Sequence, residues 1–280
     1  MKNIKYSVLM SIYAKENPKY FKVSIESMLN QTLLPDQIVI VQDGELTDEL
    51  CRIINNYCQT FPDVFTTVQL KHNVGLGLAL NAGLKACQNE LVARMDTDDI
   101  SIENRCELQV EQFNKDNDLS IVGSIINEFD DKPENIISSR VVPLEHQDIL
   151  KFSRRRNPFN HPTVMYKKSE VLKLNGYGDY RRNQDLDLFV RMLNNGSKAK
   201  NINQALVLFR ANQDNLKRRK SWIKCKSYIS MIYSFWRKGY SGFLDLLIVT
   251  ASQIIVFLSP IWFLDWLSNK FLRQSSTEKK

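Results

Sequence analysis

The chain has 280 residues, 43% of them hydrophobic and 25% charged, which suits one large domain with an appendage or two small domains. Its formal net charge of +7 fits a negatively charged partner: a nucleic acid, an anionic membrane or a phosphorylated substrate. The five cysteines are scattered and form no CxxC pair, which argues against a disulfide framework or a zinc site and indicates reduced thiols of a cytosolic protein. The first residues also lack the apolar region of a signal peptide.

The first hundred residues alternate between strand and helix patterns. Short apolar runs predict strands at 6–12, 37–41, 66–70 and 91–95, and helical spacing predicts helices at 18–30, 47–57 and 76–86. This rhythm predicts an α/β fold with a mainly parallel sheet and helices on both faces. Ligands of such sheets bind beyond the carboxyl ends of the strands. We therefore expect one rim to carry the residues that follow these strands: Tyr13, Asp43, Asn73 and the acidic residues at 96–99.

The second half of the chain is less regular. Its patterns predict strands at 120–126 and 205–209 and helices at 145–152 and 185–193. Residues 154–162 form a basic loop rich in turn formers. The expected organisation is one α/β domain in two halves, 1–115 and 116–212, with a tail at 213–280.

The tail combines basic, aromatic and apolar segments. Basic residues gather at 217–226, and residues 246–264 carry no formal charge. That stretch is long enough to span a bilayer, but Gln253 and Pro260 interrupt it. We expect a helical tail that lies on an anionic membrane, with a soluble packed helix pair and a full span as alternatives. Because the positive charge gathers here and in the basic loop, we expect no nucleic-acid partner.

An acidic motif, Arg-Met-Asp-Thr-Asp-Asp at residues 94–99, directly follows an apolar stretch. Three carboxylates in four residues repel one another and cannot be buried without a partner. A divalent cation bound to a diphosphate would offset them, since carboxylate oxygens suit hard ions such as Mg²⁺ or Mn²⁺. The alternative is an acidic turn that caps a helix beginning near Ile102.

Six short motifs occur in order across about the first 210 residues. They are residues 7–13, 24–32, 41–44, 73–75, 94–99 and 184–185. Together they resemble an inverting family 2 glycosyltransferase with a GT-A (Rossmann-like) fold, of the bacterial type that builds O-antigen, capsule or exopolysaccharide. The resemblance implies that residues 1–115 bind a nucleotide sugar and that residues 116–212 bind the acceptor and catalyse the transfer.

The same resemblance implies a set of binding residues. For the nucleotide sugar they are Ser11, Tyr13, Asp43, Asn73, Gly75, Arg94 and Asp96. Asp43 would accept the imide N–H of a uracil, and Asp98 would bind the Mn²⁺ or Mg²⁺ that bridges the diphosphate. Asp43 and Asn73 have a simpler alternative as turn residues. Asp99 is expected to be a structural cap.

The general base implied by the resemblance is Asp185, which would take the proton of the acceptor hydroxyl while the diphosphate leaves from the far side of the sugar. Its alternative role is an N-cap of the helix that begins there. The chain departs from the family at two positions: Gln184 stands where Glu is usual, and Leu80 where many relatives have Arg.

The basic loop contributes weaker candidates for an acceptor or diphosphate site. Arg155 and Arg156 suit phosphate oxygens, although a run of charges can also be a solvated face. His161 resembles a histidine often found near the family's active site, and a structural role is the alternative.

The expected function is metal-dependent, inverting transfer of one sugar from a nucleotide donor, a UDP-hexose foremost, to a saccharide on a polyprenyl diphosphate. We expect the enzyme to sit on the cytoplasmic face of the bacterial inner membrane as a peripheral or monotopic protein. One alternative is a nucleotidyltransferase, which usually needs a glycine-rich loop where residues 11–18 contain no glycine. A non-catalytic membrane-bound scaffold is the other.

Overall fold

The computed structural model describes residues 4–211 and 221–260. The strands are β1 (Tyr6–Ile12), β2 (Gln37–Gln42), β3 (Phe65–Gln69), β4 (Leu91–Arg94), β5 (Ile100–Ser101), β6 (Leu119–Phe129), β7 (Ile136–Arg140), β8 (Met165–Lys167) and β9 (Lys198–Arg210). The helices are α1 (Pro18–Leu29), α2 (Asp48–Thr60), α3 (Leu76–Ala86), α4 (Arg105–Lys115), α5 (His146–Ser153), α6 (Lys168–Lys173), α7 (Gln184–Asn194), α9 (Trp222–Arg237) and α10 (Phe243–Leu258), with a 3₁₀ turn, η1, at His161–Thr163.

The strands form one mixed sheet in the order β3-β2-β1-β4-β8-β6-β9-β5, with β7 paired to β6. The expectation of a mainly parallel sheet is confirmed for β3, β2, β1 and β4, where helices connect the strands. It is wrong for much of the second half, where β8 is antiparallel to both β4 and β6, and β7 returns along β6. A short loop joins β6 to β7, and short loops can join only antiparallel neighbours.

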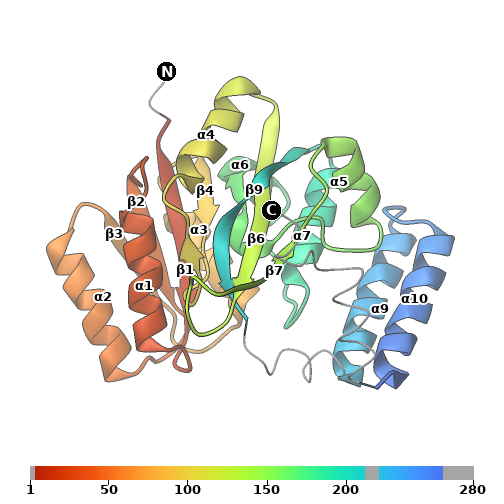
Figure 1. Ribbon diagram of the computed structural model, residues 1–280, viewed down its shortest axis with the longest axis horizontal. Coiled ribbons are helices and arrows are strands. Elements are labelled where there is room, and N and C mark those ends of the chain that lie inside the picture. The colour runs from red at the N-terminus through yellow and green to blue at the C-terminus, as the bar shows by residue number, and fades with distance from the viewer. Residues whose placement is uncertain (1–3, 212–220, 261–280) are drawn as a thin grey trace.

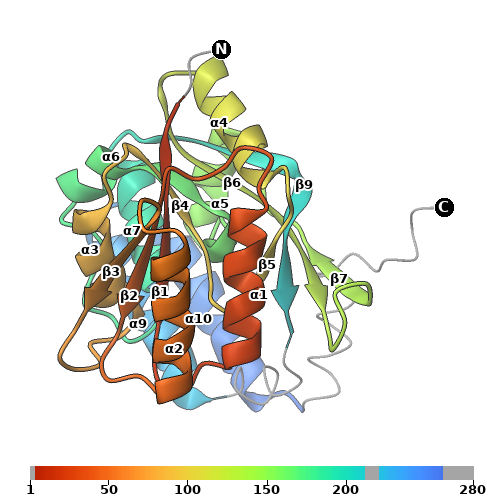
Figure 2. The same ribbon diagram turned by 90° about the vertical axis from the view of Figure 1, so that its left-hand side faces the viewer.

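Helices cover both faces of the sheet, as the sequence predicts. Apolar side chains of α1, α2 and α4 pack on one face, and those of α3, α5, α6 and α7 pack on the other. Figure 2 shows α1 and α2 in front of the sheet. The approach of α3 depends on Gly83, where a Cβ would lie 2.4 Å from both Leu9 Cδ1 and Val41 Cγ2. This lack of a side chain lets the helix rest directly on β1 and β2.

Helix α4 begins at Arg105, three residues later than the sequence predicts. The reason is a short strand that the sequence analysis missed. Residues Ile100 and Ser101 are extended and pair with β9, and the N–H of Ile102 donates to Leu206 O at 3.0 Å. Because these residues are paired with β9, the helix begins only at Arg105.

The tail is helical in its described part. Helices α9 and α10 pack on α7 through a separate apolar cluster that includes Val190, Ile232, Phe235 and Leu246. In Figure 1 this blue pair lies at the opposite end of the molecule from α2. Across residues 4–211 and 221–260, none of the helices is both long and apolar enough to cross a bilayer. The basic residues at 217–220 and the end of the apolar stretch, 261–264, lie outside the described residues.

Candidate active site

A cavity of about 260 Å³ opens where β1, β2, β3 and β4 end. Its walls gather seven of the residues that the sequence predicts for donor and metal binding: Ser11, Tyr13, Asp43, Asn73, Gly75, Asp96 and Asp98. They come from four separate strand ends, so the carboxyl rim of the parallel strands brings them together as expected. We call this space the donor-side cavity.

Asp43 organises one wall of this cavity. Its carboxylate accepts hydrogen bonds from the backbone N–H of Val74 at 2.7 Å and of Gly75 at 3.1 Å, and from the Asn73 amide at 3.0 Å. Gly75 has a φ of +90°, a backbone shape that glycine adopts without strain. A carboxylate has about four acceptor positions, so three bonds to the loop leave room for one more donor. Asp43 therefore holds the turn and remains able to accept from a ligand.

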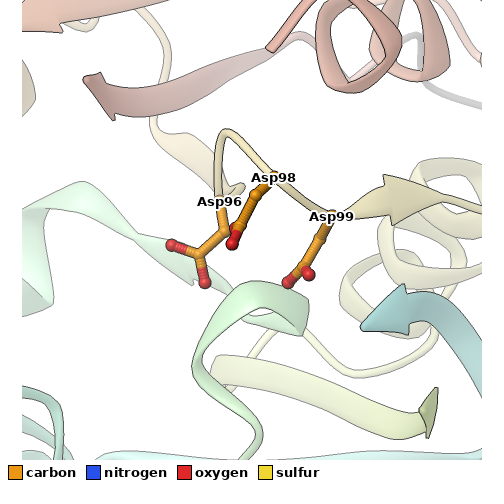
Figure 3. Close-up of side chains that lie close together, drawn as sticks. All are labelled: Asp96, Asp98 and Asp99. Carbon is orange, nitrogen blue, oxygen red and sulfur yellow. The ribbon is translucent and has the colours of Figure 1, made fainter. Parts of the chain in front are cut away.

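The acidic motif brings three carboxylates together. Asp96, Asp98 and Asp99 each place one oxygen within 4.8 Å of the others (Figure 3). Burial and the charge of Asp96 raise the pKa of Asp98 to about 6, and the same causes raise the pKa of Asp99 well above its usual value. One buried oxygen of Asp99, Oδ2, has no hydrogen-bond partner among the residues described. The site thus has unbalanced negative charge and oxygen donors, which suits a hard divalent cation.

The expectation that Asp99 caps a helix is wrong. Its Oδ1 accepts the backbone N–H of Arg210 at 2.9 Å, and the N-cap position of α4 is Asn104. Asp99 therefore ties the acidic motif to the end of β9 instead of capping a helix. The Arg210 side chain reinforces this link, since its guanidinium lies 3.7 Å from the Tyr20 ring centroid and donates to Asp98 O.

Arg94 lies buried behind the acidic motif and donates to the carboxylate of Asp96. Its Nε and Nη1 make no hydrogen bond within the part of the chain that the structure describes. The guanidinium groups of Arg94 and Arg210 both act on Asp98, but the carboxylates of the acidic motif together with Glu16 outnumber them, which again favours a bound cation.

A second cavity, of about 400 Å³, adjoins the first, because Asp96 lines both. We call it the acceptor-side cavity. It includes three residues predicted for catalysis or acceptor binding, Asp185, Arg156 and His161. Its other walls come from β6, β7, the basic loop, β9 and α9. Asp98 and Asp185 therefore lie in neighbouring cavities that meet at Asp96.

Asp185 sits in the first turn of α7, whose N-cap position is Asn183. The Asn157 amide donates to Asp185 Oδ2 at 2.6 Å. Burial raises the pKa of Asp185, while N–H groups at the helix start, Arg94 and the Asn157 amide act in the opposite direction. A half-buried carboxylate with a raised pKa that lines a cavity is well suited to accept a proton.

The three candidates of the basic loop lie in different surroundings. Arg156 lines the acceptor-side cavity, with its guanidinium 5.3 Å from the Phe152 ring centroid. Arg155 instead pairs with Asp245 of α10 at 2.5 Å. His161 is buried with Nε2 3.1 Å from the Tyr177 hydroxyl, and burial and Arg94 hold its pKa well below the usual value. His161 is therefore neutral at pH 7.

Several residues of the two cavities escaped the sequence analysis: Glu16, Arg140, Asn157 and Tyr228. Glu16 follows Tyr13 on the predicted rim, so its place after β1 was a signal that could have found it. Burial and the neighbouring Asp98 and Asp96 raise its pKa to about 7. No pattern in the sequence pointed to Tyr228, since it reaches the cavity from the tail.

Comparisons with known proteins agree with this geometry. The model of the family described as Glycosyl transferase family 2 matches residues 7–173. A UDP-Gal:alpha-D-GlcNAc-diphosphoundecaprenol beta-1,3-galactosyltransferase of Escherichia coli is 36% identical over 270 residues, which cover 96% of this chain and 97% of that protein. The amylovoran biosynthesis glycosyltransferase AmsE of Erwinia amylovora is 32% identical over 265 residues, with 95% and 98% covered.

Solved structures share the fold at low sequence identity. Mannosyltransferase PcManGT from Pyrobaculum calidifontis, in complex with GDP-Man and Mn²⁺, has a TM-score of 0.66 at 14% identity and covers 93% of this chain and 72% of its own. Staphylococcus aureus TarS 1–349 in complex with UDP has a TM-score of 0.60 at 15% identity, with 95% and 72% covered. The family model spans more than half of the chain, and both relatives align along nearly their whole length. The chain therefore belongs to glycosyl transferase family 2 and is a glycosyltransferase.

Proposed function

We propose that this enzyme transfers a hexosyl group from a UDP-sugar, with UDP-galactose the first donor to test, to a saccharide on a polyprenyl diphosphate. The observation that carries the proposal is the pair of adjoining cavities that share Asp96. The donor-side cavity has the rim residues and carboxylates expected around a nucleotide diphosphate. The acceptor-side cavity is lined by both Asp185 and Arg156. The full-length similarity to the E. coli galactosyltransferase supports the choice of substrates.

In this proposal the nucleotide lies in the donor-side cavity. Asp43 accepts from the base, while Ser11, Tyr13, Asn73 and Gly75 form the walls around the nucleoside. Asp96 holds the ribose, and Arg94, buried behind it, fixes its carboxylate. All of these residues except Arg94 line the donor-side cavity.

The acceptor enters the other cavity with its hydroxyl against Asp185. The acceptor oxygen forms a bond to the anomeric carbon as the bond from that carbon to the diphosphate oxygen breaks, so the configuration inverts. The bonding pair leaves with the diphosphate, and the acceptor proton passes to a carboxylate oxygen of Asp185. Arg156 binds phosphate oxygens of the acceptor, because guanidinium matches their geometry.

A divalent cation, Mn²⁺ or Mg²⁺, fits the acidic cluster, since three carboxylate oxygens lie within 4.8 Å of one another and one buried oxygen is unpaired. Asp98 would hold the ion, with Asp96 and Asp99 beside it. When bound, it supplies positive charge against the leaving diphosphate.

The test is a screen of UDP- and GDP-sugars with MnCl₂ and a GlcNAc-α-diphosphate that carries a short alkyl chain. We expect UDP release and a disaccharide product of inverted configuration, and we expect EDTA to abolish both. The Asp185→Asn variant should bind UDP and Mn²⁺ normally but lose roughly a hundredfold or more in kcat. Undiminished turnover of that variant would remove Asp185 as the base.

The same assay separates the two rival functions. Release of pyrophosphate from a nucleoside triphosphate and a sugar phosphate would identify a nucleotidyltransferase. Absence of binding to any sugar nucleotide with Mn²⁺ present, read as no thermal stabilisation, would favour a scaffold.

The proposal includes attachment to the anionic cytoplasmic face of the bacterial inner membrane. Helix α10 exposes large apolar side chains along one side: Phe243, Leu244, Leu247, Ile248, Ile255 and Leu258. Exposed cations lie on and directly after α9, the helix packed against it: Lys226, Arg237 and the C-cap residue Lys238. Apolar side chains beside cations are typical of a helix that lies in an anionic lipid surface. Attachment of this kind would bring the enzyme to a lipid-linked acceptor.

A further inference from the structure

Residues 155–157 of the basic loop bridge the tail and the candidate base. One end of the bridge is the hydrogen bond from the Asn157 amide to Asp185 Oδ2. The other end is the ion pair between Arg155 and Asp245 of α10. Arg156, between them, lines the acceptor-side cavity. Three consecutive residues thus connect the helix pair to the group proposed to accept the proton.

The orientation of the Asn157 amide is set by two different partners. Its Oδ1 accepts the backbone N–H of Phe159 at 3.2 Å, which leaves the NH₂ group to donate to Asp185. A donor of this kind favours the charged form of a carboxylate. It also holds one carboxylate oxygen of Asp185 in place.

The tail end of the bridge is held by several bonds. Asp245 Oδ1 accepts from Arg155 Nε at 2.5 Å, and Oδ2 accepts the backbone N–H of Gly242 at 3.0 Å. The Tyr228 hydroxyl of α9 donates to the carbonyl oxygen of Arg155 at 2.9 Å. Both tail helices therefore hold the same residue of the loop, and Tyr228 itself forms part of the cavity wall.

We propose that the α9–α10 pair is a positioning element of the active site, which holds Asp185 in its reactive orientation through Asp245, Arg155 and Asn157. The inference rests on the proposed role of Asp185 as general base. It assigns the tail a second task beyond attachment to a membrane. Arg155, predicted as a phosphate ligand, becomes a positioning residue.

The charged and titratable groups around Asp185 determine how the pH dependence of the rate changes when the Asn157 donor is removed. Those that act on it or respond to its charge are Arg94, Tyr177 and Tyr228, and Asp96, Arg156 and the neutral His161 line the same cavity. Tyr177 and Tyr228 have pKa values raised by burial and stay neutral across the working range. Loss of the Asn157 donor therefore raises the pKa of Asp185. Asp98 and Glu16 of the adjoining cavity have pKa values of about 6 and 7, but they are unchanged in these variants, so the shift between variants reports Asp185.

The test uses the full-length chain, UDP-galactose, MnCl₂ and the short-chain GlcNAc-α-diphosphate, without vesicles, so that membrane binding does not enter. For Asn157→Ala we expect roughly a tenfold to hundredfold lower kcat, an unchanged KM for the donor, and an acid limb of the rate profile moved to higher pH. Asp245→Asn and Arg155→Ala should shift the profile in the same direction by less, and Arg155→Lys should restore part of the rate. Asp148→Asn, an exposed carboxylate on α5, is the matched control and should match the unmodified enzyme.

The outcomes separate this inference from the proposed function. If Asp185→Asn is inactive but Asn157→Ala and Asp245→Asn keep the original kcat and pH profile, the tail does not position the base. If Asp185→Asn retains turnover, the proposed base is wrong and the positioning inference falls with it. If Asn157→Ala folds poorly, the kcat and pH profile of Asn157→Ser and Arg155→Lys are compared with those of the unmodified enzyme instead. An unchanged affinity for UDP shows that the donor site of each variant is intact.

Discussion

At the residue scale, Asp96 and Asp98 show how one short motif serves two cavities. Asp96 lines both cavities and accepts from the buried Arg94, whereas Asp98 lines only the donor-side cavity. Asp96 therefore has a partner within the protein, while burial and the neighbouring charge disfavour the charged form of Asp98, which a cation would stabilise.

Replacing Asp98 tests this difference. For Asp98→Asn we expect kcat/KM to fall by about a hundredfold or more, because the variant lacks the carboxylate proposed to hold the cation. Initial rates measured against MnCl₂ concentration should also show a weaker apparent metal affinity. Asp63→Asn, an exposed carboxylate after α2, should behave as the unmodified enzyme. Equal metal dependence in the two variants would contradict a ligand role for Asp98.

At the element scale, α10 presents two different sides. Leu246 and Val249 are buried against the apolar cluster with α7 and α9, whereas the other side exposes several large apolar side chains. Only one formal charge, Asp245, lies within the helix, and Arg155 pairs with it. A helix with this distribution suits a water–lipid boundary better than open water.

This predicts vesicle binding that depends on the exposed side of α10. The double variant Leu244→Ser/Leu258→Ser should bind vesicles with anionic lipid roughly tenfold more weakly, since less apolar area enters the lipid. Leu34→Ser is the matched control, because Leu34 is 64% exposed and Leu244 is 65% exposed. Co-sedimentation gives the measurement, and added salt should weaken binding of the unmodified chain. Unchanged sedimentation of the double variant would place the contact elsewhere.

At the scale of the whole molecule, the carboxylates of the donor-side cavity link stability to pH. Burial and neighbouring carboxylates raise the pKa of Asp98 to about 6 and that of Glu16 to about 7. The unfolded chain ionises these groups near pH 4, so the folded state binds their protons more tightly. Their contribution to the free energy of unfolding therefore falls as the pH rises through those values, and a bound cation offsets that loss.

The corresponding prediction concerns thermal unfolding with and without MnCl₂. The rise in Tm on adding MnCl₂ should be larger at about pH 7.5 than at about pH 5, because the ligands are ionised at the higher pH. Asp98→Asn should reduce the rise at the higher pH. The same rise at both pH values would show that these carboxylates do not bind the ion.

Local sequence patterns were sufficient to predict the bounds of several strands and helices. Strands β1, β2 and β4 and helix α3 lie within about one residue of the predicted ranges, because apolar periodicity and turn residues act locally. Seven predicted donor and metal residues share one cavity for a related reason, since parallel strands place their carboxyl ends at one rim. Strands β5 and β8 went unpredicted because their pairing partners lie far away in the sequence. Strand β7 is a hairpin partner of β6 and went unpredicted because only two of its five residues are apolar.

The sequence by itself determined the α/β class, the family and the donor-side rim, all of which depend on motifs and short-range order, and it supplied Asp185 as the proposed base. Only the tertiary structure decided that Arg155 faces Asp245, that Asp99 bonds the end of β9, and that Tyr228 of the tail lines the acceptor-side cavity. Each of these contacts joins residues about 70 to 110 positions apart. Such contacts follow from how packed elements meet in space, and no local periodicity or spacing records them.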